Sequence, residues 1–435
     1  MTIPLRTVLI FPGTTLVGLE ILRSLEYLPG FFVHGAGVDV PAGHEAGFSR
    51  YHHLPHIDHE DFPFEIRALL ARHSIDYLYP ANDVAISVLS RLDLLGQVVI
   101  SHPLATIRIA GSKIATHSEF AAIKISPNRF VSEPEDSAFP IFSKPDIGHS
   151  SIGAQIVRDK AALEALVALH GNFWGTHLVT ELLVSDEVTV DCFSTAAQGL
   201  LFAAPRTRDI AEGGVAVVTT DYEDKELTDM AALINTRLTF NGPWFFQAKR
   251  NVNGNFRLME IGARLAGASG IRRAQGVNLA QLAILASDNL SVSVYSTRFT
   301  FVSRLVNGIT EVESDECFVA LYVDLDDTLI LNGKVNKPVE ALTRYVKGLG
   351  LYVAIVTRHR SDPSRTLKTF NLDGIFDEVI HVTNGELKSS FIGKGVNSVL
   401  IDDSFSERIS SISRKNILAV DASSANQLRK LFHAD

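Results

Sequence analysis

The chain has 435 residues, of which 46% are apolar and 20% charged, and its formal net charge is −9. The length predicts two or three globular domains, and the negative charge argues against nucleic acid as an obligate partner. No apolar run is long enough to span a membrane and the N-terminal residues do not form a signal peptide pattern, so a cytoplasmic location is expected.

The first 110 residues alternate between strand-like and helix-like patterns, which is typical of a parallel sheet and predicts a Rossmann-like domain over residues 1–110. The turn from Gly13 to Gly18 lacks the GxGxxG spacing of a dinucleotide site. It is therefore interpreted as a tight turn with close helix packing. Strands are expected over residues 7–11, 31–40, 76–79 and 98–101.

Histidines are concentrated between His34 and His59, a segment that holds six of the fifteen in the chain. His53, His56 and His59 are spaced three residues apart beside acidic residues, as metal ligands can be. No cysteine or further ligand motif accompanies them, so the segment is interpreted as a solvated polar connector.

Two lysines precede features that suit phosphate binding. Lys113 follows a Gly-Ser pair, and Lys144 ends a strand-like run before a loop rich in Gly and Ser that includes Gly148. Backbone N–H groups in such loops bind phosphate oxygens, and a lysine adds positive charge. Farther on, the apolar strand at residues 179–184 offers an edge for adenine, and Glu187 offers a carboxylate for ribose hydroxyls.

A hairpin around Asn253-Gly254 is expected to bring Gln247 and Glu260 onto neighbouring strands. These blocks, in this order, resemble the ATP-grasp superfamily over about residues 1–300. The resemblance implies a domain at residues 111–305 that clamps ATP between two α+β lobes.

The same resemblance implies roles for individual residues. Glu260, with Gln247, would hold Mg²⁺, and Arg264 would stabilise the transferred phosphoryl group. The residues that would bind ATP are Lys113, Lys144, Gly148, Ser150, Ser151, Glu181, Leu183 and Glu187. The candidates to hold a substrate carboxylate are Arg206, Arg208, Arg272 and Arg273.

One position departs from the pattern. Many ATP-grasp relatives carry Glu-x-Asn-x-Arg at the metal strand, whereas this chain has Gly262 between Glu260 and Arg264. A metal ligand is therefore missing. The version with small residues between Glu and Arg, followed by Gly, resembles the branch that joins amino acids into dipeptides.

An apolar run at residues 317–323 ends in Asp324, Asp326 and Asp327, with Thr328 behind them. A buried strand that ends in acids presents carboxylates at the edge of a sheet where ligands of open α/β folds bind. Carboxylates this close repel each other unless a cation lies between them. The pattern predicts a Mg²⁺ site with a carboxylate free to attack phosphorus.

Two later strand-like runs, at residues 351–356 and 396–401, end in Thr357 and in Asp402-Asp403, and Lys388 lies between them. The four motifs, in this order, resemble the haloacid dehalogenase (HAD) superfamily of phosphohydrolases over residues 317–435. The implied roles are nucleophile for Asp324, general acid and base for Asp326, and phosphoryl contacts for Thr357 and Lys388. The implied Mg²⁺ ligands are Asp324, the backbone carbonyl of Asp326, and Asp402 or Asp403.

The intervals between Asp324, Thr357 and Lys388 each hold about one helix and one strand. Neither leaves room for the separate cap domain of many HAD relatives. The phosphatase site is therefore open to a large substrate or covered by another part of the assembly.

The predicted fold class is a multidomain α/β and α+β protein, with a Rossmann-like pre-ATP-grasp domain, a two-lobed ATP-grasp fold and a capless HAD domain with a parallel sheet. The leading hypothesis is a bifunctional enzyme that combines an ATP- and Mg²⁺-dependent carboxylate–amine ligase with a Mg²⁺-dependent phosphatase. Its partners would be a small carboxylate, an amine and a phosphate ester, and a homodimer is left open. The alternatives are a phosphatase with a non-catalytic nucleotide sensor or cap, and a structural or assembly protein with remnant sites.

Overall fold

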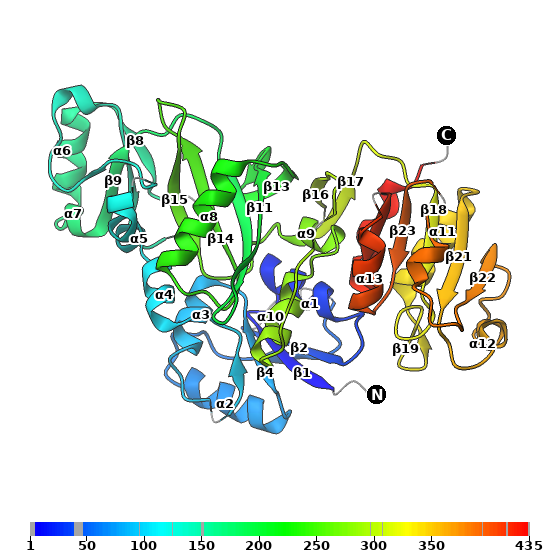
Figure 1. Ribbon diagram of the computed structural model, residues 1–435. Coiled ribbons are helices and arrows are strands. Elements are labelled where there is room, and N and C mark those ends of the chain that lie inside the picture. Colours follow the sequence, from blue (N-terminus) through cyan, green and yellow to red (C-terminus); the bar gives the residue numbers. More distant parts are fainter. Residues whose placement is uncertain are drawn as a thin grey trace. The chain divides into compact units, whose positions relative to one another are not determined.

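The computed structural model describes residues 5–38, 47–94, 96–123, 125–148, 152–295, 297–306, 308–393, 395–414 and 416–433 (Figure 1). Contacts divide the chain into two compact units. The terminal unit contains both chain ends and comprises residues 1–81, 94–98 and 268–435. The central unit comprises residues 82–93 and 99–267. The predicted limits at residues 110, 305 and 317 do not coincide with the limits of these units.

The terminal unit begins with a five-stranded sheet of order β3-β2-β1-β4-β5. Strand β1 pairs in parallel with β2 and with β4, as the alternating pattern predicts. Residues 7–11, 31–37, 77–79 and 98–99 of the expected strands are confirmed, whereas the short parallel strand β3 was not predicted. The strands are β1 (Arg6–Phe11), β2 (Phe31–Gly37), β3 (Tyr51–His53), β4 (Tyr77–Pro80) and β5 (Val98–Val99), and the helices are α1 (Leu16–Leu25) and α2 (Phe62–Arg72).

Helix α1 begins where Thr15 Oγ1 accepts a hydrogen bond from Gly18 N at 3.0 Å, which is a standard N-cap. Val17, Ile21 and Leu25 form its buried face. A Cβ atom at Gly18 would lie 2.4 Å from the carbonyl oxygen of Gly13. The glycine is therefore required by the close approach of turn and helix, in line with the tight-turn interpretation.

The terminal unit ends with a second five-stranded sheet, of order β22-β21-β18-β23-β24, in which all neighbouring strands are parallel. The first strand in the chain, β18, lies at the centre of this sheet. The next two, β21 and β22, lie on one side of it, and β23 and β24 lie on the other side. Ligands of such sheets bind beyond the carboxyl ends of the strands where the order reverses, which here is between β18 and β23. The strands are β18 (Ala320–Val323), β21 (Tyr352–Thr357), β22 (Glu378–His381), β23 (Ser398–Ile401) and β24 (Ile417–Val420). The helices are α11 (Lys337–Gly348), α12 (Pro363–Thr369) and α13 (Phe405–Ile412), and a small hairpin joins β19 (Ile330–Leu331) to β20 (Lys334–Val335).

The segment before this sheet packs into the same core. Phe299, Phe301 and Val312 are buried in one hydrophobic cluster with Phe318 and Leu321. Deleting residues 268–316 would therefore expose apolar surface of the second sheet. The segment holds α9 (Gly270–Ala274), α10 (Leu279–Ser287), and the antiparallel pair β16 (Val302–Val306) and β17 (Ile309–Glu313).

Buried polar contacts also tie the N-terminal helix to this part of the terminal unit. Arg273 Nε donates to Glu20 Oε1 at 2.9 Å, and another of its guanidinium nitrogens donates to the carbonyl of Ser423. Asn278 Nδ2 donates to the carbonyl of Ser24 at 2.7 Å. These contacts join α1 and α9 to the C-terminal turn η4 (Ala422–Gln427).

The central unit contains two four-stranded antiparallel sheets. The larger has the order β11-β10-β14-β15 and the smaller β6-β9-β7-β8. Buried Trp244 and Phe246 anchor the core of the larger sheet. The larger sheet comprises β10 (Val188–Thr195), β11 (Gly199–Thr207), β14 (Gly242–Arg250) and β15 (Phe256–Gly262), and the smaller β6 (Arg129–Phe130), β7 (Ile141–Pro145), β8 (Gln155–Val157) and β9 (His177–Glu181). A further hairpin joins β12 (Ile210–Glu212) to β13 (Val215–Thr220).

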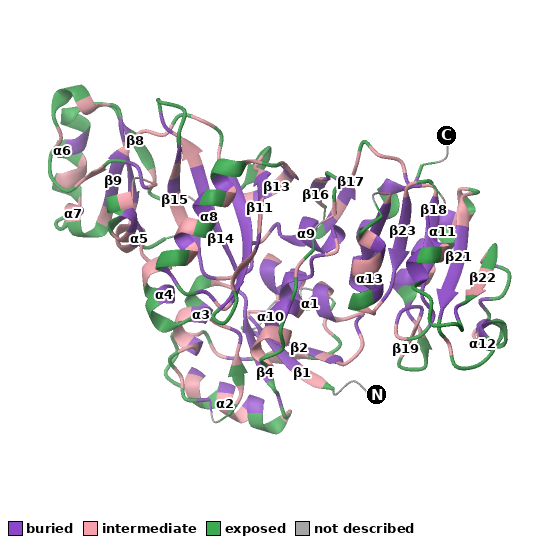
Figure 2. Ribbon diagram, in the orientation of Figure 1, coloured by how far each residue is buried: buried purple, intermediate pink, exposed green. Residues whose placement is uncertain are grey.

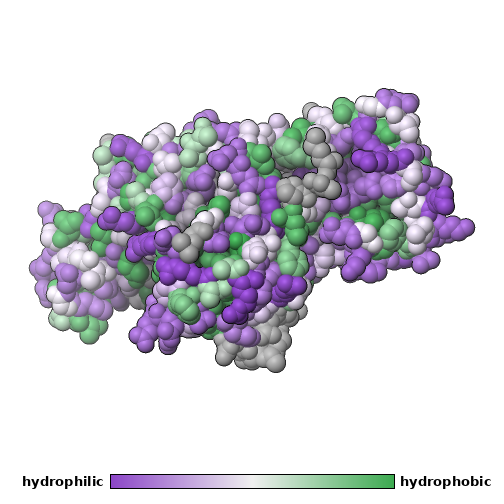
Figure 3. Space-filling view, turned by 90° about the horizontal axis from the view of Figure 1, so that it is seen from below, coloured by the Kyte–Doolittle hydropathy of each residue, from purple (hydrophilic) through white to green (hydrophobic). Residues whose placement is uncertain are grey.

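The helices of the central unit are α3 (Asp83–Leu89), α4 (Leu104–Ala110), α5 (Lys113–Phe120), α6 (Lys160–Leu169), α7 (Phe173–Thr176) and α8 (Lys225–Arg237). The strands of the main sheets are largely buried, and exposed residues gather on helices and loops (Figure 2). On the face seen in Figure 3, apolar side chains are scattered among hydrophilic ones. Within the described residues, none of the helices combines the length and the hydropathy needed to cross a membrane.

Candidate functional site

Three carboxylates meet at the carboxyl ends of two paired strands in the terminal unit. Asp324 follows β18, and Asp402 and Asp403 follow β23, with Val323 and Ile401 as the last paired residues of the two strands. Carboxylate oxygens of the three aspartates all lie within 4.8 Å of one another. The structure therefore brings together three of the acids that the sequence predicted as a cluster.

Lys388 lies between two of these carboxylates. Its Nζ is 2.8 Å from Asp324 Oδ1 and 2.8 Å from Asp402 Oδ2, and the side chain is buried. The lysine belongs to the short turn η3 (Lys388–Phe391), and its backbone N donates to Glu407 Oε2 at 3.0 Å. Glu407 in turn accepts from Arg358 Nε at 2.9 Å. The ion pair between Arg358 and Glu407 therefore anchors the backbone of Lys388 and so helps to position its side chain.

Burial and crowding shift the protonation of this carboxylate cluster. Burial raises the pKa of Asp324 to about 6, and the charge of Asp403 adds to the effect while Lys388 opposes it. Burial likewise raises the pKa of Asp402 and of Asp403 to about 6 in each case. Although burial alone lowers the pKa of Lys388, the two carboxylates raise it above its ordinary value. At neutral pH one ammonium faces three carboxylates, an excess of negative oxygen that suits a hard divalent cation such as Mg²⁺.

The loop after β18 is fixed by hydrogen bonds to the loop after β23. Thr328 Oγ1 accepts from Asp403 N at 3.0 Å, and Arg408 Nη1 donates to the carbonyls of Asp402 at 2.6 Å and Asp403 at 2.8 Å. Asp327 adopts a left-handed conformation with φ of 55°. These contacts hold the carboxylates in position, and Arg408 and Glu407 are supporting residues that sequence reasoning missed.

Asp326 does not lie among the three clustered carboxylates. Its side chain is 55% exposed, and its Oδ2 is 2.8 Å from His359 Nδ1. Thr357 is fully buried at the end of β21, and its Oγ1 accepts from His359 N at 3.2 Å. His359 was missed, although its place two residues beyond Thr357 at a strand end was a usable signal. The implied roles of Asp326 and Thr357 stay predictions.

Magnesium is expected to stabilise the protein more at about pH 7.5 than at about pH 5. The three carboxyl groups have an ordinary pKa of 3.8 and a pKa of about 6 in the folded protein. Between these two pKa values the folded protein binds protons that the unfolded chain has already released. The bound protons favour the folded state, and their contribution to its stability is lost as the pH rises through 6. Melting temperatures with and without MgCl₂ at both pH values measure the effect. An equal shift at both would contradict it, and Asp324→Asn should reduce it.

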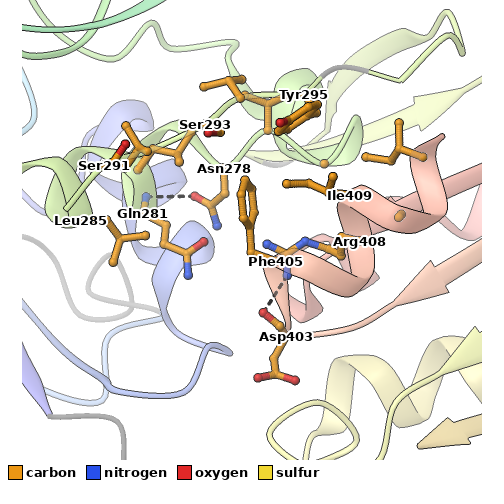
Figure 4. Close-up of a pocket in the computed structure, with 17 residues that line it drawn as sticks. Asn278, Gln281, Leu285, Ser291, Ser293, Tyr295, Asp403, Phe405, Arg408 and Ile409 are labelled. Carbon is orange, nitrogen blue, oxygen red and sulfur yellow. Dashed lines mark hydrogen bonds between the residues drawn. The ribbon is translucent and has the colours of Figure 1, made fainter. Parts of the chain in front are cut away.

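A pocket of about 270 Å³ adjoins the carboxylate cluster (Figure 4). Its labelled residues come from the segment from Asn278 to Tyr295, which includes α10, from the loop after β23 and from α13, and the carboxylate of Asp403 is turned away from the others. The pocket therefore borders the backbone of Asp403 without receiving its carboxylate. Its other lining residues are Gly276, Val277, Asn278, Gln281, Leu282, Leu285, Ser291, Val292, Ser293, Val294, Phe405, Arg408, Ile409, Ile412 and Ala419.

In the central unit, Lys144 is buried at the end of β7, and its Nζ donates to the carbonyl of Met259 at 3.0 Å. Burial lowers the pKa of Lys144 to about 8, while the neighbouring charge of Glu260 opposes this shift and that of Lys113 adds to it. A buried cation next to an acid at a strand edge is suited to an anionic ligand such as a polyphosphate.

Gln247 and Glu260 face each other across β14 and β15, as the hairpin predicted. Glu187 is near both Lys144 and Glu260, and its Oε1 is 2.8 Å from Arg208 Nη1. Burial raises the pKa of Glu187, and Glu260 adds to the shift. The structure therefore gathers the predicted Lys144, Glu187, Gln247 and Glu260 in one part of the central unit, with oxygen donors that suit Mg²⁺.

The other residues predicted to bind ATP are Lys113, Gly148, Ser150, Ser151, Glu181 and Leu183. Lys113 Nζ donates to the carbonyl of Gly148 at 2.9 Å. Glu181 Oε1 accepts from Asn128 N at 2.9 Å at the end of β9, and Leu183 follows two residues later. Ser150 and Ser151 lie outside the described residues.

The predicted arginines are divided between the two units, and within each unit they contact other protein groups. Arg206 forms a buried ion pair with Asp191 at 2.9 Å, and Arg264 pairs with Asp83 at 2.8 Å. Arg272 and Arg273 are buried in the terminal unit, where Arg272 Nη1 donates to Gln275 Oε1 and Arg273 pairs with Glu20. These contacts are between protein groups. Substrate binding by Arg206, Arg208, Arg272 and Arg273 therefore stays a prediction from the sequence, without support from this geometry.

Gly262 has no room for a side chain. A Cβ atom there would lie 2.1 Å from Cε1 of Phe245, whose ring is also 5.2 Å from the guanidinium carbon of Arg264. Gly262→Ala is expected to destabilise the protein by about 1–3 kcal/mol because the buried ring must move. Gly171→Ala is the matched control, since a Cβ there meets nothing within 4 Å. Chemical denaturation measures both, and equal unfolding free energies would contradict the clash.

Comparison with known proteins finds a family model that matches part of the chain. Residues 174–333 match the model of a family described as ATP-grasp in the biosynthetic pathway with Ter operon. The matched range includes Asp324 but ends before Lys388 and Asp402. None of the curated proteins matches the chain.

Solved structures give a broader likeness. The biotin carboxylase domain of Hydrogenobacter thermophilus 2-oxoglutarate carboxylase, in complex with MgADP, ADP and bicarbonate, is 12% identical with a TM-score of 0.56, over 69% of this chain and 74% of that one. The L-amino acid ligase from Bacillus licheniformis is 14% identical with a TM-score of 0.53, over 70% and 81%. N5-carboxyaminoimidazole synthetase from Staphylococcus aureus, complexed with ADP, is 11% identical with a TM-score of 0.54, over 70% and 83%. At these identities the likeness concerns the fold alone, and it extends over about 70% of the chain.

Proposed function

We propose that the protein is a bifunctional enzyme, with an ATP- and Mg²⁺-dependent carboxylate–amine ligase in the central unit and a HAD-type, Mg²⁺-dependent phosphatase in the terminal unit. The observation that carries the phosphatase is the cluster of Asp324, Asp402 and Asp403 with Lys388 at the ends of β18 and β23. The ligase is supported by the ATP-grasp-like fold and by buried Lys144 beside Glu260.

In the phosphatase reaction, an oxygen of Asp324 attacks the phosphorus of the ester and the bond to the leaving oxygen breaks. Asp326 gives that oxygen a proton. Asp326 then takes a proton from water, whose oxygen attacks the phosphorus and releases inorganic phosphate from Asp324. The pKa of about 6 leaves Asp324 ionised at neutral pH, as a nucleophile must be.

Asp324, the carbonyl of Asp326, and Asp402 or Asp403 would hold Mg²⁺, which supplies charge neutralisation for the phosphoryl oxygens. Lys388 balances the remaining carboxylate charge and orients Asp324 through its 2.8 Å contact. Asp326 is exposed beside His359, where it can exchange protons with solvent.

In the ligase reaction, a substrate carboxylate attacks the terminal phosphorus of ATP and ADP leaves, which gives an acyl phosphate. The amine nitrogen then attacks the acyl carbon, loses a proton and displaces phosphate. Lys144 and Lys113 would bind the nucleotide phosphates, Glu187 the ribose, and Glu260 with Gln247 the Mg²⁺ that shields the phosphate charge.

A second candidate keeps the phosphatase and makes the ATP-grasp region a non-catalytic nucleotide sensor. The observation that favours it is Phe245, which fills the space beside Gly262 where many relatives carry a metal-binding Asn. A sensor would bind ATP without turnover.

The experiment that separates these functions follows ADP and inorganic phosphate independently while the protein acts on pools of carboxylates, amines and phosphate esters. Amine-dependent ADP formation supports the ligase. Phosphate release without ATP supports the phosphatase. ATP binding without ADP formation over a broad panel would favour the sensor, and the absence of both products would overturn both enzymatic assignments.

A further inference from the structure

Three histidines from different elements of the N-terminal sheet converge in the terminal unit. His34 lies on β2, His52 on the neighbouring strand β3, and His73 caps the C-terminus of α2. One ring nitrogen from each lies within 4.8 Å of the other two. His34 Nδ1 is 2.8 Å from His52 Nε2, and the rings of His52 and His73 have their centroids 4.4 Å apart.

The histidines that the sequence singled out are not the ones that converge. His53, His56 and His59 are all exposed, and His56 and His59 lie beside Asp58 and Asp61. This agrees with a solvated connector for these three. His34 and His52 belong to the same histidine-rich segment, whereas His73 is brought to them only by the fold.

His34 is the most buried of the three, with 1% of its surface exposed, and its Nε2 has no hydrogen-bond partner among the described residues. A buried N–H group without an acceptor is costly, so the proton of His34 belongs on Nδ1, which donates to His52 Nε2. This hydrogen bond uses the lone pair that His52 would offer a metal. A metal ion between the rings would replace the hydrogen bond, at the cost of placing the His34 proton on the unpartnered Nε2.

The surroundings disfavour a positive charge on His34 and on His52. Burial lowers the pKa of His34 to about 4, and His52, His73 and Arg50 add to the shift. Burial also lowers the pKa of His52, with further contributions from His73 and Arg50. Neutral imidazole is the form that binds transition metals. Three imidazoles with one open position are typical of sites for zinc and similar ions.

An open pocket of about 310 Å³ gives access to the cluster, and both His52 and His73 line it. Glu65 and Arg72 also line this pocket. Arg50 and Arg72 disfavour a bare dication and favour an anionic fourth ligand, such as hydroxide, on the ion.

We propose that His34, His52 and His73 bind one divalent transition-metal ion of the zinc class, with the fourth coordination position facing the pocket. The ion clamps the edge strand β3 and the end of α2 onto β2. This site is independent of the two proposed Mg²⁺ sites, which offer oxygen ligands.

The test uses the full chain, stripped of metal by a chelator and titrated with Co²⁺ and then with Zn²⁺. One equivalent of Co²⁺ should give the intense visible bands of four-coordinate nitrogen ligation, which oxygen-bound Co²⁺ does not give, and Zn²⁺ should abolish them. His52→Ala with His73→Ala should lower Zn²⁺ affinity by at least about a hundred-fold. His56→Ala with His59→Ala is the matched control, because both residues are exposed and neither lines the pocket, and it should bind as the natural chain does.

The melting temperature keeps the result interpretable if a variant is less stable. Zn²⁺ should raise the melting temperature of the natural chain and of the control, but not that of the single variant His73→Ala. Weak, octahedral Co²⁺ spectra from the natural chain would overturn the proposal. So would a Co²⁺ spectrum that survives in the His52→Ala, His73→Ala variant.

Discussion

Asp324→Asn is expected to reduce hydrolysis of p-nitrophenyl phosphate by at least about a thousand-fold in kcat. An amide oxygen is a far weaker nucleophile than the carboxylate that Lys388 orients at 2.8 Å. The substitution should not unfold the protein, because burial already disfavours the charged form of Asp324 and raises its pKa to about 6. Steady-state kinetics and a thermal melt measure the two effects.

Asp327→Asn is the matched control for this experiment. Asp327 is in the same loop, outside the carboxylate cluster, and its left-handed φ of 55° is tolerated by Asn. It should hydrolyse the ester at close to the natural rate. Natural activity in Asp324→Asn would contradict the assignment of the nucleophile, and equal losses in both variants would indicate a general disturbance of the loop.

Lys144→Met is expected to reduce ATP-dependent ADP formation by about a hundred-fold or more. The variant removes a buried cation that opposes the charge of Glu260 and would face the phosphates. Because burial lowers the pKa of Lys144 to about 8, the natural chain should also lose ATP affinity as the pH rises through 8. ADP release and ATP binding, each measured across this range, test both statements.

Lys144→Met should be more stable than the natural chain, although its activity should be lower. Keeping a buried lysine charged costs free energy, so the ATP-free natural chain should become more stable as the pH rises from 8 toward the ordinary lysine value of 10.5. The variant should lack this dependence. Lys160→Met, at an exposed residue on α6, is the control and should form ADP at the natural rate. Unchanged ADP formation in Lys144→Met would remove Lys144 from the nucleotide site.

The carboxylate cluster could be predicted because strand periodicity places Asp324 and Asp402 at the ends of two runs that pair in parallel. Carboxyl ends of parallel strands share one edge, so the prediction needed no knowledge of side-chain packing. Gln247 and Glu260 could be predicted for a similar reason, because the Asn253-Gly254 turn sets their register.

Other features depend on contacts between distant parts of the chain. His73 meets His34 only because α2 ends over β2 and β3, and β3 is too short to have a clear sequence pattern. Arg273 pairs with Glu20, which lies 253 positions earlier in the chain. The sequence does not reveal this partner, so Arg273 was predicted to bind a substrate. Phe245, on the neighbouring strand β14, is a further example. Its ring fills the space that a side chain at position 262 would need.

Buried contacts cross residue 317, from Arg273 to Ser423 and from Phe299 and Phe301 to the second sheet, and they have a consequence for how the two proposed activities are inherited. A gene divided near residue 317 would leave one product without the Ser423 carbonyl that accepts from Arg273, and the other without Phe299 and Phe301 over its second sheet. Both fragments would lose buried contacts and are expected to be less stable than the undivided chain. The two catalysts would therefore be synthesised in equal number in every cell, and selection could change their relative output only through turnover rates and not through expression.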